Sequence, residues 1–373
     1  MRVLFVGLKI GAGIESICNS IKAECDKKQG IETAYVDIYA ENQKMAQFSK
    51  DSYYKLVKYI PRLTALGQRM SLWLALKTRK NHLFINKDVK CCKAEIMKYI
   101  ERFKPDVIYT PLCMVAMALD ELIEESKIQL KYIFQIPDFL IPYYAQNLKH
   151  CSYVISSCDK VTESLLKLKF DDAKILTYGI PLNPKFKNLK EQRENILQKL
   201  GYEDKKYILI SNGGAGFANN YKIVTDFYDK VGEYSFIVVN GRNLESKEKI
   251  DNFIKEKNIS NVINLGFVDN MHELMKISEI MIGKCGSSTI NEASLSGLKF
   301  IGLNNFLVPE IYNIKYLKSK DAIIVVKNGK QIEKALKIFI NDQKENIHKN
   351  FTKICNPKSC EQIADVVCSL CDK

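Results

Sequence analysis

The stretch GKCGSSTINEA, residues 283–293, passes from a strand through small residues straight into a helix, and it decides the fold predicted for this chain. The preceding EIMI, residues 279–282, is typical of a buried strand. Gly286, Ser287 and Ser288 leave the first N–H groups of the helix unobstructed. Such a helix end attracts anions, so the stretch predicts a diphosphate-binding turn, although a serine-capped helix after a strand is also ordinary structure.

Three further predicted strands end in small or hydrogen-bonding residues, which strengthens this prediction. The strands are YILI at 207–210, FIVV at 236–239 and VINL at 262–265. Open parallel α/β sheets bind their ligands at the carboxyl ends of the strands, so the four turns predict one shared ligand site. The segments that follow the three strands are SNGGAG with Gly213, Gly214 and Gly216, NGRN with Gly241 and Arg242, and GFVDN with Phe267 and Val268.

Length and composition predict a folded, soluble protein. The chain has 373 residues, of which 46% are hydrophobic and 27% charged, and this length suits two domains. Its net charge of +13 favours acidic partners. No apolar run of about 18 residues is present, and the apolar start is short and leads into a Gly-rich turn. We therefore expect neither a membrane span nor a signal peptide, and a cytoplasmic location.

Twelve cysteines are scattered along the chain, singly apart from the pair Cys91-Cys92. Because no secretion signal is present, we expect thiols in a reducing compartment rather than disulfides. Cys368 and Cys371 have the Cys-x-x-Cys spacing of some zinc sites. No second pair of this kind accompanies them, and their segment has a helical pattern, so packing is the favoured interpretation and no metal is expected.

Strands and helices alternate along the chain, which predicts βαβ units with parallel sheets. Helix-like segments such as Val89–Phe103 separate the strands. Two prolines in GIPLNP, residues 179–184, exclude regular structure and mark a linker. A second alternating series runs from Tyr207 to Val326. The strands predicted before the linker are Arg2–Leu8, Thr33–Tyr39, Asp106–Pro111, Lys131–Ile136, Tyr153–Ser157 and Lys174–Gly179.

The predicted fold class is therefore α/β, with two Rossmann-like doubly wound domains that face each other across a cleft. We expect an N-terminal domain at residues 1–182 and a C-terminal domain at residues 183–352. Residues 353–373 are expected to form a C-terminal helix that packs back on the N-terminal domain.

The stretch from Lys50 to Lys93 interrupts the alternation. It contains eleven Lys and Arg residues against Asp51 and Asp88, and so carries nine of the thirteen net charges. Aromatic and aliphatic residues, including the single Trp73, are interleaved with the basic ones. This pattern is typical of a helix in an anionic membrane interface, while a domain helix with a solvated basic face is the alternative. Nucleic acid binding is not expected, because no base-stacking fold or signature is visible.

Over nearly its whole length the chain resembles a family of GT-B glycosyltransferases. This family includes the processive diacylglycerol glucosyltransferases of Gram-positive bacteria and the plant monogalactosyldiacylglycerol synthases, with the peptidoglycan GlcNAc transferase as a more distant relative. The matching segments are PDF at 137–139, YGIPL at 178–182 with Phe186, GFVDNMHEL at 266–274, GSST at 286–289 with Glu292-Ala293, and EIYN at 310–313.

The resemblance implies a UDP-sugar donor in the C-terminal domain and an acceptor-binding, membrane-facing role for the N-terminal domain. Lys284 and Arg242 are cations placed to meet the charge of a leaving UDP in place of a metal, so no cofactor is expected. Lys284 is equally compatible with a surface lysine at a strand end. The resemblance places the diphosphate at Gly286, Ser287, Ser288 and Thr289, the ribose at Glu292, the uracil at Phe267 and Val268, and the hexose at Glu310 and Asn313.

The histidines of this family are absent. Its first Gly-rich turn reads Gly-x-Gly-His, whereas here Gly11 and Gly13 are followed by Ile14, and a second family histidine falls near Pro142. An inverting transferase needs a base within reach of the acceptor hydroxyl, and isoleucine cannot accept a proton.

Two carboxylates are candidate catalytic residues in place of the histidines, Asp138 and Glu15, and Asp138 is favoured. The sequence thus predicts an inverting hexosyltransferase that acts on a membrane lipid such as diacylglycerol, at the inner face of the cell membrane. Two alternatives stay open: a polyprenyl-linked or soluble glycan acceptor, and a UDP-sugar-binding protein that has lost activity. A UDP-GlcNAc 2-epimerase is a weaker rival, because its histidine- and arginine-bearing sites have no evident counterpart here.

Overall fold

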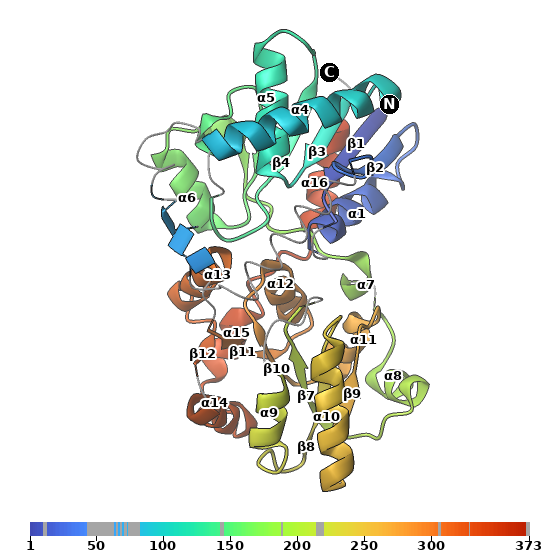
Figure 1. Ribbon diagram of the computed structural model, residues 1–373, viewed down its shortest axis with the longest axis vertical. Coiled ribbons are helices and arrows are strands. Elements are labelled where there is room, and N and C mark those ends of the chain that lie inside the picture. The colour runs from blue at the N-terminus through green and yellow to red at the C-terminus, as the bar shows by residue number, and fades with distance from the viewer. Residues whose placement is uncertain are drawn as a thin grey trace. The chain divides into compact units, whose positions relative to one another are not determined.

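The computed structural model divides into two compact units, each built on its own six-stranded sheet (Figure 1). Unit 1, with sheet A, comprises Met1–Asn183, Leu307–Pro309 and Asn356–Lys373. Unit 2, with sheet B, comprises Pro184–Phe306 and Glu310–Cys355. The structure describes residues 1–9, 13–42, 63–64, 66–67, 69–70, 73, 83–141, 145–187, 189–213, 220–304, 307–327 and 329–370.

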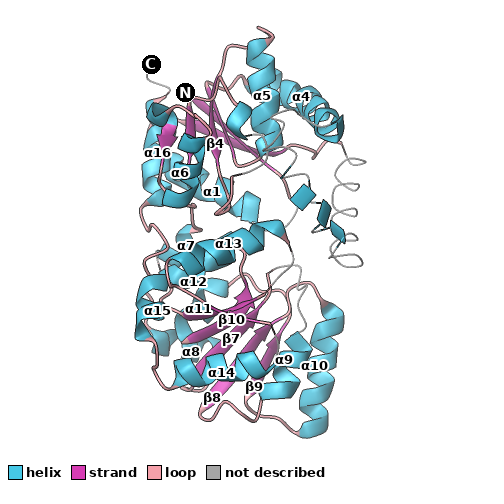
Figure 2. Cartoon of the chain, turned by 90° about the vertical axis from the view of Figure 1, so that its left-hand side faces the viewer, coloured by secondary structure: helices cyan, strands magenta, loops and turns pink. Residues whose placement is uncertain are grey.

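Sheet A has the strand order β2-β1-β3-β4-β5-β6, and every strand pair in it is parallel. Figure 2 shows α4 and α5 on one face of the sheet and α1 and α16 on the other. The main elements are β1 (Arg2–Gly7), α1 (Gly13–Cys25), β2 (Glu32–Asp37), α4 (Leu83–Phe103), β3 (Val107–Thr110), α5 (Cys113–Glu124), β4 (Lys131–Gln135), β5 (Tyr153–Ile155), α6 (Asp159–Lys167), β6 (Ile175–Leu176) and α16 (Ser359–Ser369).

Helices on both faces explain why the strands of sheet A are short apolar runs. All residues of β3, and all but the first of β1 and β4, are buried. Helix α16 comes from the far end of the chain and packs against α1, where the sulfur atoms of Cys25 and Cys368 lie 3.9 Å apart. The C-terminal helix thus covers the face of sheet A on which α1 lies.

Sheet B has the strand order β12-β11-β10-β7-β8-β9, again with parallel pairs only. Helices α9 and α10 lie on one face, and α8 and α11 on the other (Figure 2). The elements are α7 (Pro184–Lys187), α8 (Arg193–Leu200), β7 (Lys206–Ser211), α9 (Asn220–Phe227), β8 (Tyr234–Val239), α10 (Leu244–Lys257), β9 (Val262–Leu265), α11 (Met271–Ile277), β10 (Ile280–Lys284), α12 (Ser287–Leu295), β11 (Lys299–Leu303), α13 (Val308–Ser319), β12 (Ile324–Val326), α14 (Gly329–Ile340) and α15 (Glu345–Phe351).

The strand order of sheet B reverses between β7 and β10, and this is the position where doubly wound sheets bind ligands. The two strands approach closely because Gly283 has no side chain. A Cβ atom at Gly283 would lie 2.5 Å from the backbone oxygen of Ser211. Gly213, which follows β7, therefore lies beside the end of β10 at the carboxyl edge of the sheet.

These observations confirm the predicted doubly wound α/β class. Most predicted strands match within two residues at each end. The strand predicted for Lys174–Gly179 is confined to Ile175–Leu176, because Lys174 ends a 3-10 helix and the Tyr178 N–H turns back to the Leu176 carbonyl oxygen at 3.1 Å. The helix predicted from Val89 begins earlier, at Leu83. The cleft between the two domains stays a prediction.

Several predictions concern membranes, metals and thiols. None of the helices in the described ranges is both long and apolar enough to cross a bilayer. The described cysteines are free thiols, and most of them are buried. Within the same ranges, no cluster of His, Cys, Asp and Glu side chains is arranged to hold a metal ion. Cys371 lies outside the described residues, so the tail zinc alternative is not decided there.

We predict that Gly283→Ala destabilises the protein by about 2 kcal/mol, because its methyl group would force β7 and β10 apart. Gly266→Ala is the matched control, since its nearest neighbour beyond the adjoining residues would be 3.6 Å away, at ordinary contact distance. Urea denaturation of the purified variants measures the difference. Equal stability of the two variants would contradict the close approach of the strands.

Candidate functional site

The turn between β10 and α12 leaves the first N–H groups of α12 without a side-chain cap. Its N-cap residue is Gly286, with φ −73° and ψ 141°, and glycine has no side chain to accept their hydrogen bonds. Ser287, Ser288 and Thr289 follow in the first turn and are partly exposed. Uncapped N–H groups and the positive end of a helix dipole attract anions, so we call residues 284–289 the anion turn, and binding of a diphosphate there stays a prediction.

Lys284 ends β10 and brings a positive charge to the same turn. A Cβ atom at Gly286 would lie 3.4 Å from Lys284 Cε, and one at Gly213 would lie 3.5 Å from the same atom. Gly213 has a φ of +75°, which favours glycine. The lysine side chain therefore contacts both Gly-rich turns, the one after β7 and the one after β10. Gly214 and Gly216 lie outside the described residues.

Helix α13 contacts this turn with two residues that the resemblance assigned to the hexose. Lys284 Nζ lies 3.0 Å from Glu310 Oε1. Glu310 is only 5% exposed, and among the described residues its second oxygen, Oε2, is buried without a hydrogen-bond partner. Asn313 is fully buried and donates from Nδ2 to the carbonyl oxygen of Cys285 at 2.9 Å. Contact of either residue with a hexose stays a prediction.

Glu292 lies in the second turn of α12. The residue keeps some exposure, but desolvation by the surrounding protein raises the pKa of its carboxyl group to about 8. A large fraction of Glu292 is therefore protonated at neutral pH, which reduces its repulsion of an anion at the helix N-terminus.

Phe267 and Arg242 form an exposed aromatic platform after β9 and β8. The Phe267 ring is 58% exposed, and the guanidinium carbon of Arg242 lies 5.3 Å from its centroid. Val268 beside it is partly exposed, and Gly241 has a φ of +59°. An exposed ring with a cation over it suits stacking of a base. Of the two cations expected to meet the charge of a leaving UDP, Lys284 lies at the anion turn, whereas Arg242 lies over Phe267.

A chain of amides, partly or fully buried, connects the carboxyl ends of β7, β8 and β9. The chain begins at the Asp251 carboxylate, which can only accept hydrogen bonds. The neighbouring amide must therefore donate to it, and this fixes the orientation of each following amide. At the far end, Asn212 Oδ1 is buried and has no partner among the described residues. The Nδ2-to-oxygen distances are 2.7 Å from Asn264 to Asp251, 2.7 Å from Asn240 to Asn264, 3.1 Å from Asn220 to Asn240 and 2.5 Å from Asn212 to Asn220.

This amide chain was not predicted, although an asparagine at three successive strand ends was a visible signal. It joins Asn212, before the first Gly-rich turn of unit 2, to Asn220, the first residue of α9. Directed hydrogen bonds of this kind, two of which are buried, favour a single arrangement of the residues that they join. The amide chain therefore fixes both ends of the segment that carries Gly213.

In unit 1, the candidate catalytic carboxylates lie after β1 and β4. Glu15 is in the first turn of α1, with Lys9 Nζ at 3.5 Å. Asp138 is partly exposed, and its backbone oxygen accepts a hydrogen bond from Ser157 Oγ at 2.6 Å. Gly13 begins α1, while Gly11 lies outside the described residues. The catalytic role of either carboxylate stays a prediction.

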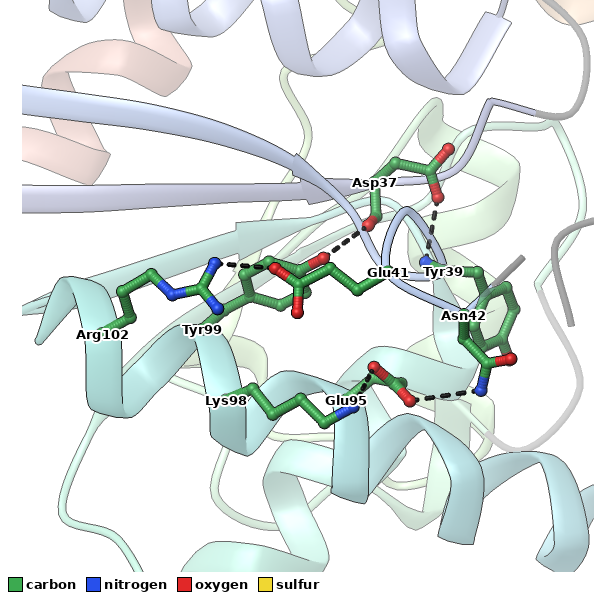
Figure 3. Close-up of polar contacts among 8 residues, drawn as sticks. All are labelled: Asp37, Tyr39, Glu41, Asn42, Glu95, Lys98, Tyr99 and Arg102. Carbon is green, nitrogen blue, oxygen red and sulfur yellow. Dashed lines mark hydrogen bonds and ion pairs between the residues drawn. The ribbon is translucent and has the colours of Figure 1, made fainter. Parts of the chain in front are cut away.

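The chain on either side of residues 43–82 is joined by polar contacts (Figure 3). Asn42 Nδ2 donates to Glu95 Oε1 at 3.2 Å, and Glu95 on α4 is only 4% exposed. Arg102, also on α4, pairs with Glu41 at 2.7 Å. The turn after β2 is therefore held against α4. Most of the basic stretch 50–93 lies outside the described residues.

The two units, each built on a six-stranded parallel sheet with helices on both faces, form a GT-B-like α/β fold. A family model described as the glycosyltransferase family 28 C-terminal domain matches residues 172–367, more than half of the chain. A model described as monogalactosyldiacylglycerol (MGDG) synthase matches residues 15–182. The chain belongs to glycosyltransferase family 28, among the GT-B enzymes that include monogalactosyldiacylglycerol synthases and processive diacylglycerol glucosyltransferases, as the resemblance predicted.

Individual relatives agree with this family. The processive diacylglycerol beta-glucosyltransferase of Bacillus cytotoxicus is 24% identical over 267 residues, which cover 71% of this chain and 68% of the relative. The protein of the same name from Bacillus licheniformis is 20% identical and covers 97% of this chain and 93% of the relative. A UDP-GlcNAc 2-epimerase from Neisseria meningitidis, solved bound to UDP-GlcNAc, matches with a TM-score of 0.63 at 15% identity, covering 99% of each chain. At that identity the likeness shows the fold alone.

The raised pKa of Glu292 predicts a pH-dependent effect of Glu292→Gln. Its folded-state pKa of about 8 exceeds its ordinary value of 4.5, so this group's contribution to stability falls as pH rises from about 5 to above about 8. The variant removes that loss. We expect its melting temperature to match wild type at pH 5 and to exceed it increasingly towards pH 9. Exposed Glu248→Gln is the control, and a difference independent of pH would contradict the raised pKa.

Proposed function

We propose that this protein is an inverting glycosyltransferase that moves a hexose from a UDP-sugar to a hydroxyl group of a membrane lipid such as diacylglycerol. The proposed UDP-sugar donor rests on one observation, the uncapped N-terminus of α12 with Lys284 beside it. This turn offers N–H groups and one positive charge to a diphosphate without a metal. The exposed Phe267 ring, with Arg242 over it, supplies a surface for the uracil base.

The reaction would be a direct displacement at the anomeric carbon. The acceptor oxygen forms a bond to that carbon, and the carbon–oxygen bond to UDP breaks with its electron pair leaving on the diphosphate. A base takes the proton of the acceptor hydroxyl, and the configuration inverts from α to β. We assign the base to Asp138, with Glu15 as the second candidate, because both are carboxylates after strand ends of sheet A. Helix N–H groups and Lys284 stabilise the leaving UDP.

The lipid acceptor has two supports. The relatives are named as diacylglycerol beta-glucosyltransferases. In addition, the described residues of the basic stretch include four large apolar side chains that are more than half exposed: Leu63, Leu66, Met70 and Trp73. They recur at helical spacing within a segment rich in Lys and Arg, as in helices that lie in an anionic membrane interface. We therefore place the enzyme peripherally on the inner face of the cell membrane.

A polyprenyl-linked or soluble glycan acceptor is the second candidate, and the missing family histidines are the observation that favours it. An inactive UDP-sugar-binding protein is a third. The three candidates differ in a measurable quantity, which is the dependence of UDP release on added diacylglycerol.

The decisive assay follows UDP release from UDP-glucose, UDP-galactose and UDP-GlcNAc, each with and without diacylglycerol in anionic vesicles. We expect one donor to release UDP only when diacylglycerol is present. Asp138→Asn should lower that rate at least about 100-fold, with donor affinity retained. Donor binding without release from any of the three would contradict a diacylglycerol acceptor and favour another acceptor or the inactive binding protein, and undiminished transfer by Asp138→Asn would rule out this base.

Membrane binding is tested by flotation with anionic vesicles. Leu66→Asp and Met70→Asp should each lower vesicle partitioning about tenfold or more, because each removes a large apolar side chain from the interface. Leu244→Asp is the matched control, since Leu244 is 73% exposed but lies on α10 in unit 2. Equal flotation of all three variants and wild type would count against a membrane interface at residues 63–73.

A further inference from the structure

Helix α13 holds two successive residues of the anion turn with side chains one helical turn apart. Glu310 pairs with the Lys284 side chain, and Asn313 donates to the Cys285 carbonyl oxygen. Both contacts come from residues that are almost completely buried. Binding of a hexose by these side chains would not by itself require either contact with the turn.

The peptide group between Cys285 and Gly286 is held at both ends. Its oxygen accepts from Asn313 Nδ2 at 2.9 Å, and its N–H donates to the Lys284 oxygen at 2.9 Å. Cys285 itself is fully buried, and a Cβ atom at Gly302 would lie 2.6 Å from its sulfur, so the residue fills a space that only glycine leaves open. Because Gly286 is the N-cap, this peptide group sets the direction of the free N–H groups of α12.

Glu310 holds the ammonium group of Lys284 in place at the same turn. The Lys284 stem contacts both glycine turns, and its ammonium group lies on Glu310 Oε1. A lysine in an open turn loses side-chain entropy when it is ordered on a ligand. Because Glu310 already orders the lysine, less side-chain entropy is lost when a diphosphate binds. Among the described residues, Glu310 Oε2 has no hydrogen-bond partner and can still accept one.

We propose that Glu310 and Asn313 are positioning residues of the diphosphate turn, so that affinity for a nucleoside diphosphate depends on them even when no hexose is attached. This inference rests on the proposed UDP-sugar donor. It differs from the assignment by resemblance, which places both residues against the hexose. A ligand with the diphosphate but without the sugar separates the two roles.

The test compares the affinities of UDP and UMP for the full-length protein by calorimetry. Asn313→Ala should weaken UDP binding about tenfold, the effect of one well-placed hydrogen bond, and UMP binding less than about twofold. A general loss of structure would weaken both ligands alike, so the ratio of the two affinities identifies positioning. Lys318→Ala, an exposed change on the same helix, should leave both affinities unchanged.

Glu310 provides a second test if Asn313→Ala does not fold. Glu310→Ala should weaken UDP binding, and Glu310→Gln should restore it, because the amide oxygen can still accept from Lys284 Nζ. Unchanged UDP affinity in the alanine variants, with a loss confined to UDP-hexoses, would overturn the inference and leave the proposed function intact. Absence of UDP binding by the wild-type protein would overturn both.

Discussion

The close pairing of β10 with β7 is the constraint on which the candidate donor site depends. Gly283 permits it, because any side chain there would meet the backbone of Ser211. The pairing lies where the strand order of sheet B reverses, so the turns after the two strands are adjacent. Lys284 can contact both turns only because of this adjacency. The free N–H groups of α12 and the lysine charge are thereby brought to one place.

Networks of partly or fully buried polar groups then favour a single arrangement of the described residues at this edge of the sheet. One set is the amide chain from Asp251 to Asn212, in which an acceptor-only carboxylate orients each amide after it. The other is the pair on α13, which holds the turn after β10. Each buried group costs desolvation unless it is paired, so these networks favour one arrangement of the turns over alternatives. An ordered anion site needs little rearrangement to accept its ligand.

Much of this architecture could be predicted from the sequence, because alternating apolar runs and Gly-rich turns directly encode strands and their ends. The turn at 286–288 was predicted to bind a diphosphate from its small residues and from its place at one of four strand ends, and diphosphate binding there stays a prediction. The partners of Lys284 and Cys285 on α13 were not predicted, because they join residues 26 and 28 positions apart and local patterns carry no such information. The raised pKa of Glu292 likewise depends on tertiary packing, since desolvation is its cause.

The central claim is that the turn between β10 and α12 binds the diphosphate of a sugar nucleotide. Hydrogen–deuterium exchange with and without UDP tests it directly, because bound phosphate oxygens protect the N–H groups that they contact. UDP should slow exchange in peptides covering residues 284–295 and leave α4 of unit 1 unchanged. Protection that spared residues 284–295, or that occurred only in unit 1, would contradict it.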